Sequence, residues 1–355
     1  MKILQVMAGN AHGGAETAFV DMCLAMHEAG IAQEVATRPN DVRVPPLLEA
    51  GLTVHTLPFG GALDIYTPYK LAQIAKKFQP DIAQTWLSRG AAKMPKWKPS
   101  MGIPRYLNVA RLGGYYKKKY FTTMDYFTTI TPDLKRHVET KFDVEDAAVR
   151  HINNFAETED APVLINRADM GTPDDATVIL GLGRLHPSKA FDTMITVMTR
   201  LPAHIHLWIA GEGPQRAELE ALIDTLGVQD RVKLLGWRSD RAALFQAVDI
   251  CFFCSRYEPF GTVFVQSWAQ ETPLIVTKAD GPRQFVRHDD DGLLVDIDDE
   301  AGWIDAVMRM DDDKTLGKRL AKNGLKRYQG EFTKEKCVNS YLEYYAEIRA
   351  RENLS

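Results

Sequence analysis

The sequence is poor in cysteine, in long apolar runs and in net charge. Its 355 residues include four cysteines, and its formal net charge is −4. This near-balanced charge argues against a general nucleic-acid-binding protein, which needs a strongly basic surface. No apolar run reaches membrane-spanning length, and the run in MKILQVMAG is too short for a signal peptide. We therefore expect a protein of the cytoplasm, soluble or peripheral on the inner face of the plasma membrane.

The spacing of two cysteines raises a question of chemistry. Cys251 and Cys254 have the C-x-x-C spacing of redox and metal sites, but they stand in the apolar run DICFFCS. Apolar neighbours favour the interpretation that both are buried cysteines of a β-strand, with the redox or metal site as the alternative. A reducing compartment fits this interpretation.

The pattern along the chain predicts an α/β protein. Short apolar segments alternate with helical patterns, which indicates parallel sheets built from right-handed crossovers. The predicted strands are KILQVM, QEVAT, TVHTL, DIAQT, RYLNV and YFTTI in the first half, and TVILGLG, IHLWIAG, RVKLLG, DICFFC, PLIVT and GLLVD in the second.

The length suits two domains, each with its own core. Residues 155–176 are rich in acids and prolines and are interpreted as a linker. We expect one Rossmann-like domain over residues 1–165, a second over 166–332, and a C-terminal helix over 333–355 that docks back on the first. Two doubly wound domains would then face each other across a cleft, with a ligand at the carboxyl ends of the strands.

The first candidate site follows the predicted strand TVILGLG. The segment GRLHPSKAFD places Arg184 and Lys189 between this strand and the next helix. Two cations at the carboxyl end of a parallel strand suit a diphosphate, because Arg can bind two phosphate oxygens at once and Lys adds a point charge. A solvated basic loop is the alternative.

The second candidate site follows DICFFC. Helix propensity resumes near Gly261 in EPFGTVFVQ, so the amides of Phe260 and Thr262 would lie at a free helix N-terminus, which binds anions. Glu258 lies just before this helix N-terminus. A diphosphate bound there would repel the carboxylate of Glu258, so Glu258 is better suited to accept hydrogen bonds from sugar hydroxyls. An ordinary turn with an exposed glutamate is the alternative.

The glycine turns do not match a dinucleotide-binding fingerprint, because AGNAHGGAE and GLGRLH lack the G-x-G-x-x-G spacing. Over almost the whole chain, the sequence instead resembles the retaining GT-B glycosyltransferases of the family-four group, glycosyl transferases group 1. These enzymes move a sugar from a nucleotide donor to an acceptor. Some of them build lipopolysaccharide or other cell-surface glycans. The resemblance rests on the order of GGAE, GRLHPSKAFD, GEGP, VKLLG, EPFGTVFVQ and ETPLIVT.

The resemblance implies roles for individual residues. Arg184 and Lys189 would bind the donor diphosphate and stabilise the departing phosphate, and Glu258 would hold hydroxyl groups of the donor sugar; these three are the predicted catalytic residues. It implies no metal and no cofactor, the substrate being a UDP- or GDP-sugar. The aspartate runs HDDDG and MDDDK are interpreted as solvated turns. The predicted donor-binding residues are Gly14, Phe260, Gly261, Thr262, Gln266 and Trp237.

The chain also departs from the family pattern. Gln266 stands where the family commonly has a glutamate that binds the ribose hydroxyls, and Gln284 takes a second acidic position. Gln can still donate and accept hydrogen bonds, but without the strength of a charged acceptor. Arg111 lies near the position at which many relatives have a histidine, so no catalytic histidine is assigned.

A basic segment offers a hypothesis about the acceptor. Residues 91–120 contain eight Lys or Arg and no acid, interleaved with tryptophan and tyrosine. Such a surface suits an anionic membrane, and a solvated basic face is the alternative. We therefore expect a retaining, metal-independent hexosyltransferase that uses a glycan or lipid-linked acceptor, with lipopolysaccharide or surface-polysaccharide synthesis as its context. The rival interpretations are a sugar-nucleotide epimerase and a non-catalytic sugar-nucleotide-binding scaffold.

Overall fold

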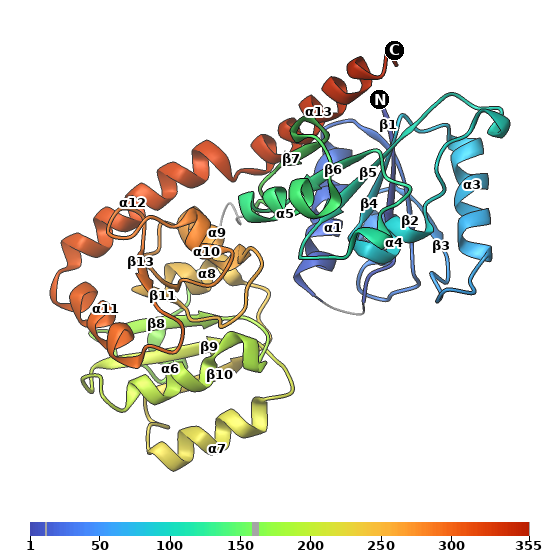
Figure 1. Ribbon diagram of the computed structural model, residues 1–355. Coiled ribbons are helices and arrows are strands. Elements are labelled where there is room, and N and C mark those ends of the chain that lie inside the picture. The colour runs from blue at the N-terminus through green and yellow to red at the C-terminus, as the bar shows by residue number, and fades with distance from the viewer. Residues whose placement is uncertain (11–12, 158–162, 355) are drawn as a thin grey trace. The chain divides into compact units, whose positions relative to one another are not determined.

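The computed structural model describes residues 1–10, 13–157 and 163–354, and the chain divides into two compact units (Figure 1). The first unit comprises Met1–Asn154 together with Lys334–Ser355, and the second comprises Phe155–Thr333. Each unit is built on one parallel sheet. The predicted α/β class with two Rossmann-like sheets is confirmed.

The sheet of the first unit has seven strands in the order β3-β2-β1-β4-β5-β6-β7. Every residue of β4 and β5 is buried, as expected for a parallel sheet that helices cover on both faces. The sequence predicted the first six strands but not β7, because its three residues are too short for a periodic signal. The bounds are β1 Lys2–Met7, β2 Ala32–Thr37, β3 Thr53–Thr56, β4 Ile82–Trp86, β5 Leu107–Leu112, β6 Tyr126–Thr129 and β7 Val149–His151.

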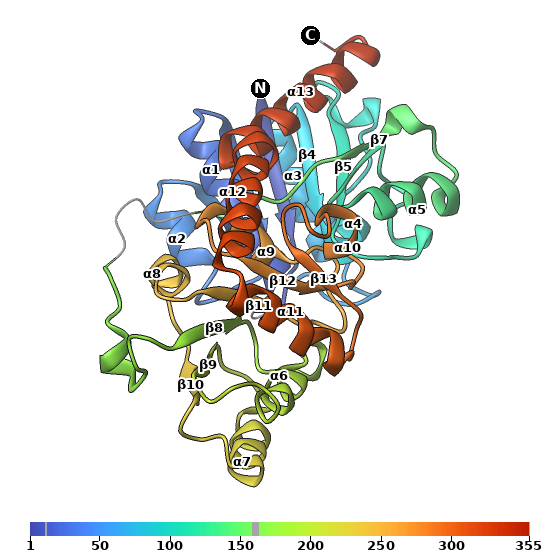
Figure 2. The same ribbon diagram turned by 90° about the vertical axis from the view of Figure 1, so that its left-hand side faces the viewer.

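The helices of the first unit pack on both faces of its sheet. Right-handed crossovers place α3, α4 and α5 on one face, where they share a hydrophobic core with the strands. Helix α1 packs against α2 and against the last helix, α13 (Figure 2). The bounds are α1 Gly14–Glu28, α2 Val44–Glu49, α3 Tyr66–Phe78, α4 Leu87–Lys93, α5 Pro132–Phe142 and α13 Lys334–Arg351, with short 3-10 helices η1 Pro99–Met101, η2 Lys118–Tyr120 and η3 Asp146–Ala148.

The sheet of the second unit has six parallel strands in the order β10-β9-β8-β11-β12-β13. The chain starts in the middle at β8, builds outward to β10, then returns to β11 on the other side of β8. The pair β8 and β11 is therefore a topological switch point. All six strands were predicted, and their bounds are β8 Thr177–Leu182, β9 Ile205–Ala210, β10 Val232–Gly236, β11 Ile250–Phe253, β12 Leu274–Thr277 and β13 Leu293–Val295.

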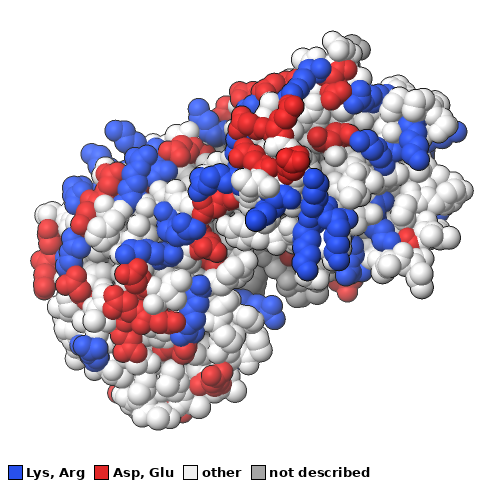
Figure 3. Space-filling model, viewed as in Figure 1, with Lys and Arg blue, Asp and Glu red and all other residues white. Residues whose placement is uncertain are grey.

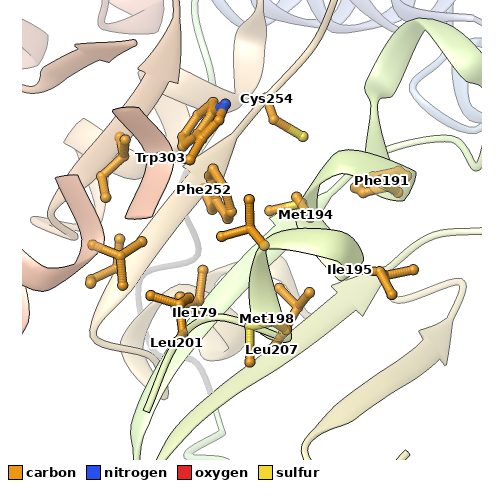
Figure 4. Close-up of a cluster of buried hydrophobic side chains, with 14 of the residues drawn as sticks. Ile179, Phe191, Met194, Ile195, Met198, Leu201, Leu207, Phe252, Cys254 and Trp303 are labelled. Carbon is orange, nitrogen blue, oxygen red and sulfur yellow. The ribbon is translucent and has the colours of Figure 1, made fainter. Parts of the chain in front are cut away.

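The core of the second unit lies between its sheet and α6, α7 and α11 (Figure 4). The rings of Phe252 and Trp303 lie 3.9 Å apart between centroids, and Met194 of α6 belongs to the same buried cluster. Cys254 belongs to this core as well, and all four cysteines are free and buried. The prediction of buried cysteines is confirmed. The helices are α6 Phe191–Met198, α7 Arg216–Leu226, α8 Arg241–Gln246, α9 Thr262–Ala269, α10 Pro282–Phe285, α11 Glu300–Asp312 and α12 Lys314–Glu331, with 3-10 helices η4 Arg167–Met170 and η5 Pro187–Lys189.

The units meet in sequence at residues 154 and 155, eleven residues before the boundary expected from the sequence. Residues 163–176 lie in the second unit because their side chains bond to it. Arg167 donates hydrogen bonds to the carbonyl oxygen of Ala247 at 2.8 Å and to Asp249 at 3.0 Å. Thr172 accepts one from the indole of Trp208 at 3.0 Å. No helix in the described part of the chain is long and apolar enough to cross a membrane.

Candidate active site

Two turns at the switch point of the second sheet carry the charged residues that the sequence singled out. The turn after β8 contains Arg184 and leads to η5, which ends at Lys189. The turn after β11 contains Glu258 and leads to α9. Because β8 and β11 are neighbours whose connections leave in opposite directions, their carboxyl ends border the crevice in which such sheets bind ligands.

Lys189 and Glu258 form an ion pair across this switch point. The ammonium group of Lys189 donates a short hydrogen bond to Oε2 of Glu258. The two side chains are 21% and 16% exposed, so the pair is shielded but still open to solvent. The Lys189 Nζ atom also lies 5.4 Å from the ring centroid of Phe253, at the end of β11. The structure thus brings together two of the three predicted catalytic side chains.

Arg184 lies in the same connection as Lys189, but its side chain has different surroundings. Its backbone neighbours are fixed, since the amides of Gly183 and Leu185 donate to the carbonyl oxygens of Ala210 and Glu212, both at 3.0 Å. The Arg184 side chain is exposed and makes no ion pair or side-chain hydrogen bond among the described residues. A cation on a fixed turn is available to bind an anion.

Close backbone packing holds these turns together. A Cβ atom at Gly211, which follows β9, would lie 1.8 Å from the carbonyl oxygen of Gly183. A Cβ atom at Gly281 would lie 2.2 Å from the carbonyl oxygen of Phe260. Both distances are far below a van der Waals contact, so only glycine permits this approach. The turn GEGP therefore has a packing role against the turn that carries Arg184.

Helix α9 begins as the sequence predicted, directly after Gly261. Gly261 has a φ of 96°, in the region that favours glycine, and a Cβ there would lie 2.7 Å from Cε1 of Phe253. No side chain caps the helix, and the amide of Phe264 donates to the carbonyl oxygen of Gly261, so the amides of Thr262 and Val263 remain as free donors among the described residues. The ring of Phe260 is buried among Phe264 and other aromatic residues, so only its backbone can serve a ligand.

The two glutamines at positions where the family resemblance implies acidic residues lie in different settings. Gln266 is on α9, one turn from its start, and is 8% exposed. The amide of Gln284 donates to the carbonyl oxygen of Asp280 at the start of α10. Gln284 therefore stabilises its own helix, whereas Gln266 makes no side-chain hydrogen bond to another described residue.

One predicted donor-binding residue, Trp237, lies away from this cluster within the second unit, and another, Gly14, belongs to the first unit. Trp237 follows the edge strand β10, is 80% exposed, and makes no ring contact or hydrogen bond within the described residues. The strands β9 and β8 separate β10 from β11. Gly14 belongs to the first unit, where it opens α1 and where a Cβ atom would meet no atom within 4 Å.

The sequence missed Arg256, which joins the two turns of the site. Its guanidinium binds both carboxylate oxygens of Asp192 at 2.9 and 2.8 Å and Asp298 at 2.7 Å. Its Nη1 also donates to the carbonyl oxygen of Pro187 at 3.0 Å, and its backbone amide donates to that of Ser188 at 2.9 Å. The hydrogen bonds and charge of the Asp192 carboxylate raise the pKa of Arg256. No sequence spacing could reveal these partners, since the two acids lie 64 and 42 positions away.

The thiol of Cys254 bonds to the backbone at the end of the turn that carries Lys189. Its thiol donates to the carbonyl oxygens of Lys189 and Ala190 at 3.0 and 3.1 Å, and burial raises its pKa. Ala190 has a φ of 53°, which is costly for a residue with a side chain. The buried thiol thus helps to hold the backbone that presents Lys189.

The prediction of solvated aspartates is wrong for Asp291 of HDDDG and for Asp311 of MDDDK, whose side chain is 9% exposed and accepts a hydrogen bond from the hydroxyl group of Thr177 at 2.6 Å. Asp291 is 1% exposed, pairs with Arg327 at 2.8 Å and accepts a hydrogen bond from the Arg287 amide at 2.7 Å. Burial raises the pKa of its carboxyl group. Its carbonyl accepts from the indole of Trp268 at 2.8 Å, so this segment links α9 to α12. Within the described residues, no group of three or more His, Cys, Asp or Glu is placed to hold a metal ion.

Only part of the basic segment 91–120 is an exposed cationic surface. Arg111 is 2% exposed, and its guanidinium lies 4.2 Å from the ring centroid of Trp86. Burial lowers the pKa of Arg111. Tyr106 is buried, and Lys96 and Arg105 pair with acids at 3.2 and 2.8 Å. The cations that are exposed and without an ion pair among the described residues are Lys98, Lys117, Lys118 and Lys119.

Known proteins are similar to this chain in sequence. The family model of glycosyl transferases group 1 matches residues 164–327, which include both turns of the site. The chain is 34% identical over 337 residues to the lipopolysaccharide core biosynthesis glycosyltransferase LpsE of Rhizobium meliloti, covering 94% of this chain and 96% of LpsE. It is 31% identical over 351 residues to LpsD of the same organism, which bears the same description, covering 97% and 98%.

A solved structure shows the same fold at lower identity. Anabaena Alr3699/HepE, crystallised in complex with UDP and glucose, has a TM-score of 0.81 and 19% identity, covering 98% of this chain and 100% of that chain. Its likeness extends over both units, each with a Rossmann-like sheet. With two relatives matched over nearly their full length, the chain belongs to the glycosyl transferases group 1 family and has the GT-B fold.

Proposed function

We propose that the protein is a retaining, metal-independent hexosyltransferase of lipopolysaccharide or surface-polysaccharide synthesis. It would transfer a sugar from a UDP- or GDP-sugar to a hydroxyl group of a glycan or lipid-linked acceptor. The observation that carries this proposal is the Lys189–Glu258 pair at the switch point, next to the uncapped start of α9. The descriptions of LpsE and LpsD support the acceptor class, and the UDP bound to HepE supports a nucleotide-sugar donor.

The charges of the site suit a diphosphate. The ammonium group of Lys189 has three donors, so it can keep its bond to Glu258 and still bind a phosphate oxygen. Arg184 can bind two phosphate oxygens with one guanidinium. The amides at the start of α9 add the positive end of a helix dipole. All three would stabilise the negative charge that develops on the departing diphosphate.

The proposed transfer step exchanges the bond between donor sugar and phosphate for a bond between that sugar and the acceptor. The bond between the anomeric carbon and the phosphate oxygen breaks, and its electron pair goes to the nucleoside diphosphate. The acceptor oxygen bonds to the anomeric carbon from the same face, and its proton passes to the departing phosphate oxygen. The anomeric configuration is therefore kept. Glu258 would hold the sugar by accepting hydrogen bonds from its hydroxyl groups.

A thermal-shift panel of nucleotide sugars tests the proposal. UDP-hexoses, UDP-N-acetylhexosamines, UDP-hexuronic acids and GDP-mannose would each be added to the full chain. A donor at a hundred times its dissociation constant adds about 2.7 kcal/mol to the free energy of unfolding. The donor that stabilises the chain is then incubated with and without acceptor. Conversion without acceptor would indicate the epimerase, binding without transfer or hydrolysis would indicate the scaffold, and no stabilisation by any donor would contradict the proposal.

A further inference from the structure

Apolar side chains of the first unit are most exposed in the connection from β3 to α3. Leu63 is 94% exposed and Ile65 is 83% exposed, and Tyr66 and Tyr69 follow at 51% and 59%. We call these four residues the apolar tip. Single exposed apolar residues are ordinary, but a cluster within one turn of chain marks an interaction surface.

The apolar tip stands on a well-bonded loop. Asp64 lies inside the loop, where its carboxylate accepts hydrogen bonds from the amides of Gly60 and Thr67 at 2.7 and 2.9 Å. Lys93, the last residue of α4, donates to the carbonyl oxygen of Asp64 at 2.7 Å. These bonds define the loop conformation, so the exposure of the apolar tip is a feature of the folded unit.

Exposed cations lie in the connection after β5. Lys117, Lys118 and Lys119 are exposed and make no ion pair among the described residues. Tyr115 and Tyr120, at 45% and 40% exposure, flank them. We call residues 115–120 the lysine segment. The Nζ atom of Lys119 lies 5.1 Å from the ring centroid of Tyr120, so cation and aromatic ring share one surface.

Helix α4 contacts both the loop of the apolar tip and the lysine segment. Helix α4 binds the tip loop through Lys93 and packs against η2, which is part of the lysine segment. Both connections start at the carboxyl ends of parallel strands, and therefore at the same edge of the sheet. The ring of Tyr115 also contacts His137 of α5 at 5.1 Å between centroids. Figure 3 shows Lys and Arg side chains gathered on this part of the first unit, near α5.

We propose that the apolar tip and the lysine segment together dock on a membrane that contains anionic lipid. Lysines bind anionic head groups, tyrosines favour the membrane interface, and Leu63 and Ile65 would enter the apolar region below it. Charge complementarity decides for this partner, because α4 contacts both the loop of the apolar tip and a segment with three lysines that make no ion pair among the described residues. The inference deepens the proposed function, on which it rests for the lipid-linked acceptor, and it replaces the wider segment 91–120 as the membrane surface.

Vesicle flotation of the full chain, without nucleotide sugar, tests the inference. The chain should float with vesicles of phosphatidylcholine and phosphatidylglycerol and remain unbound with phosphatidylcholine alone. The triple variant K117Q/K118Q/K119Q should partition on the order of a hundredfold more weakly. The double variant Leu63→Ser/Ile65→Ser should partition roughly tenfold more weakly, because less apolar surface is buried.

A matched triple variant on another surface controls for charge. Lys318, Lys322 and Lys326 are exposed on α12 of the second unit, with no ion pair among the described residues. Replacing all three with Gln changes the net charge from −4 to −7, as the lysine-segment variant does. This control should still float, and circular dichroism should show that every variant is folded.

Three results would overturn the inference. They are equal flotation with neutral and anionic vesicles, an equal loss in the α12 control, and no flotation with either vesicle. The last result would indicate a protein partner for the apolar tip. Because flotation needs no donor, a chain that binds a nucleotide sugar but does not float contradicts only this inference. A chain that floats but binds no donor contradicts only the proposed function.

Discussion

The Nη1 atom of Arg256 lies 3.0 Å from the carbonyl oxygen of Pro187, although 69 positions separate the two residues in the chain. Pro187 begins the short helix that ends at Lys189, and Arg256 lies two positions before Glu258. One guanidinium therefore ties together the two turns that supply the ion pair of the site. We regard Arg256 as a positioning residue, since it acts on the reaction through Lys189 and Glu258.

Replacing Arg256 should loosen the site and lower stability. In Arg256→Met the carboxylates of Asp192 and Asp298 lose their guanidinium partner, although Asp298 still accepts a hydrogen bond from Thr193. We expect a loss of about 1–3 kcal/mol in the free energy of unfolding, because the network is partly exposed. Urea unfolding measures this loss, with Arg241→Met on the surface of α8 as the matched control. Donor binding in the folded variant should weaken, and an unaltered donor affinity would contradict the positioning role.

Loss of the Lys189 ammonium should reduce turnover more than donor binding. Lys189→Ala should lower kcat by about 10²–10³, because stabilisation of the departing phosphate is missing from the transition state. Lys189→Arg should retain part of the activity, as it keeps the positive charge. The half-buried Lys233 on the edge strand offers a control, and Lys233→Ala should turn over normally. Near-normal kcat in Lys189→Ala would refute the assigned role.

A carboxylate at position 266 should raise the affinity for the nucleotide sugar. Gln266 is on α9 and makes no side-chain hydrogen bond to a described residue, so Gln266→Glu breaks no such bond. A charged acceptor binds hydroxyl groups about 1 kcal/mol more strongly than an amide, which corresponds to roughly fivefold tighter binding. Titration calorimetry with the donor measures the change. Gln270→Glu, at the end of the same helix, should leave affinity as it is; a gain there equal to that of Gln266→Glu would point to a general charge effect.

Acid should destabilise the protein through Asp311. Burial favours its neutral form, but hydrogen bonds from Lys314, Thr177 and His204 outweigh this and lower the pKa of Asp311 to about 2. A carboxyl group whose pKa is lower in the folded state stabilises the fold at pH values above its unfolded pKa. That contribution is lost as the pH falls from about 4 to about 2.

Asp311→Asn should therefore be less stable than the parent chain at pH 7. Its free energy of unfolding should also depend less steeply on pH between about 4 and 2. Urea unfolding across this range provides the measurement. The side chain of its exposed neighbour Asp312 makes no hydrogen bond or ion pair among the described residues, so Asp312→Asn should keep the slope of the parent chain. An identical slope in both variants would argue against the role of Asp311.

Two glycines should respond in opposite ways to the same substitution. Gly281→Ala places a Cβ atom 2.2 Å from the carbonyl oxygen of Phe260, so the turn before α9 must shift, at a cost of about 1–3 kcal/mol. Gly330 lies in α12 with no atom within 4 Å of a new Cβ. Gly330→Ala should stabilise the chain by about 0.5–1 kcal/mol, since alanine favours helix. Thermal unfolding compares them, and an equal effect of both substitutions would show that the close approach at Gly281 is unimportant.

Much of the site was predictable because it lies next to strong strand signals. The apolar runs TVILGLG and DICFFC are clear strand signals, and Lys189 and Glu258 lie in the connections that follow them. The start of α9 was predictable from Gly261, since a glycine before renewed helix propensity indicates a helix end. Trp237 shows the limit of this reasoning: its strand β10 was predicted, but its position at the sheet edge depends on strand order.

The sequence by itself determined twelve of the thirteen strands found in the described residues, together with the two charged turns, because these depend on local periodicity and on neighbours along the chain. Only the tertiary structure decided which distant groups meet. It joined Arg256 to Asp192, buried Asp291 against Arg327, and left Leu63 exposed on a loop that is bonded to α4. These relationships depend on strand order and on which helix covers which face, and such long-range packing leaves no periodic signal in the chain.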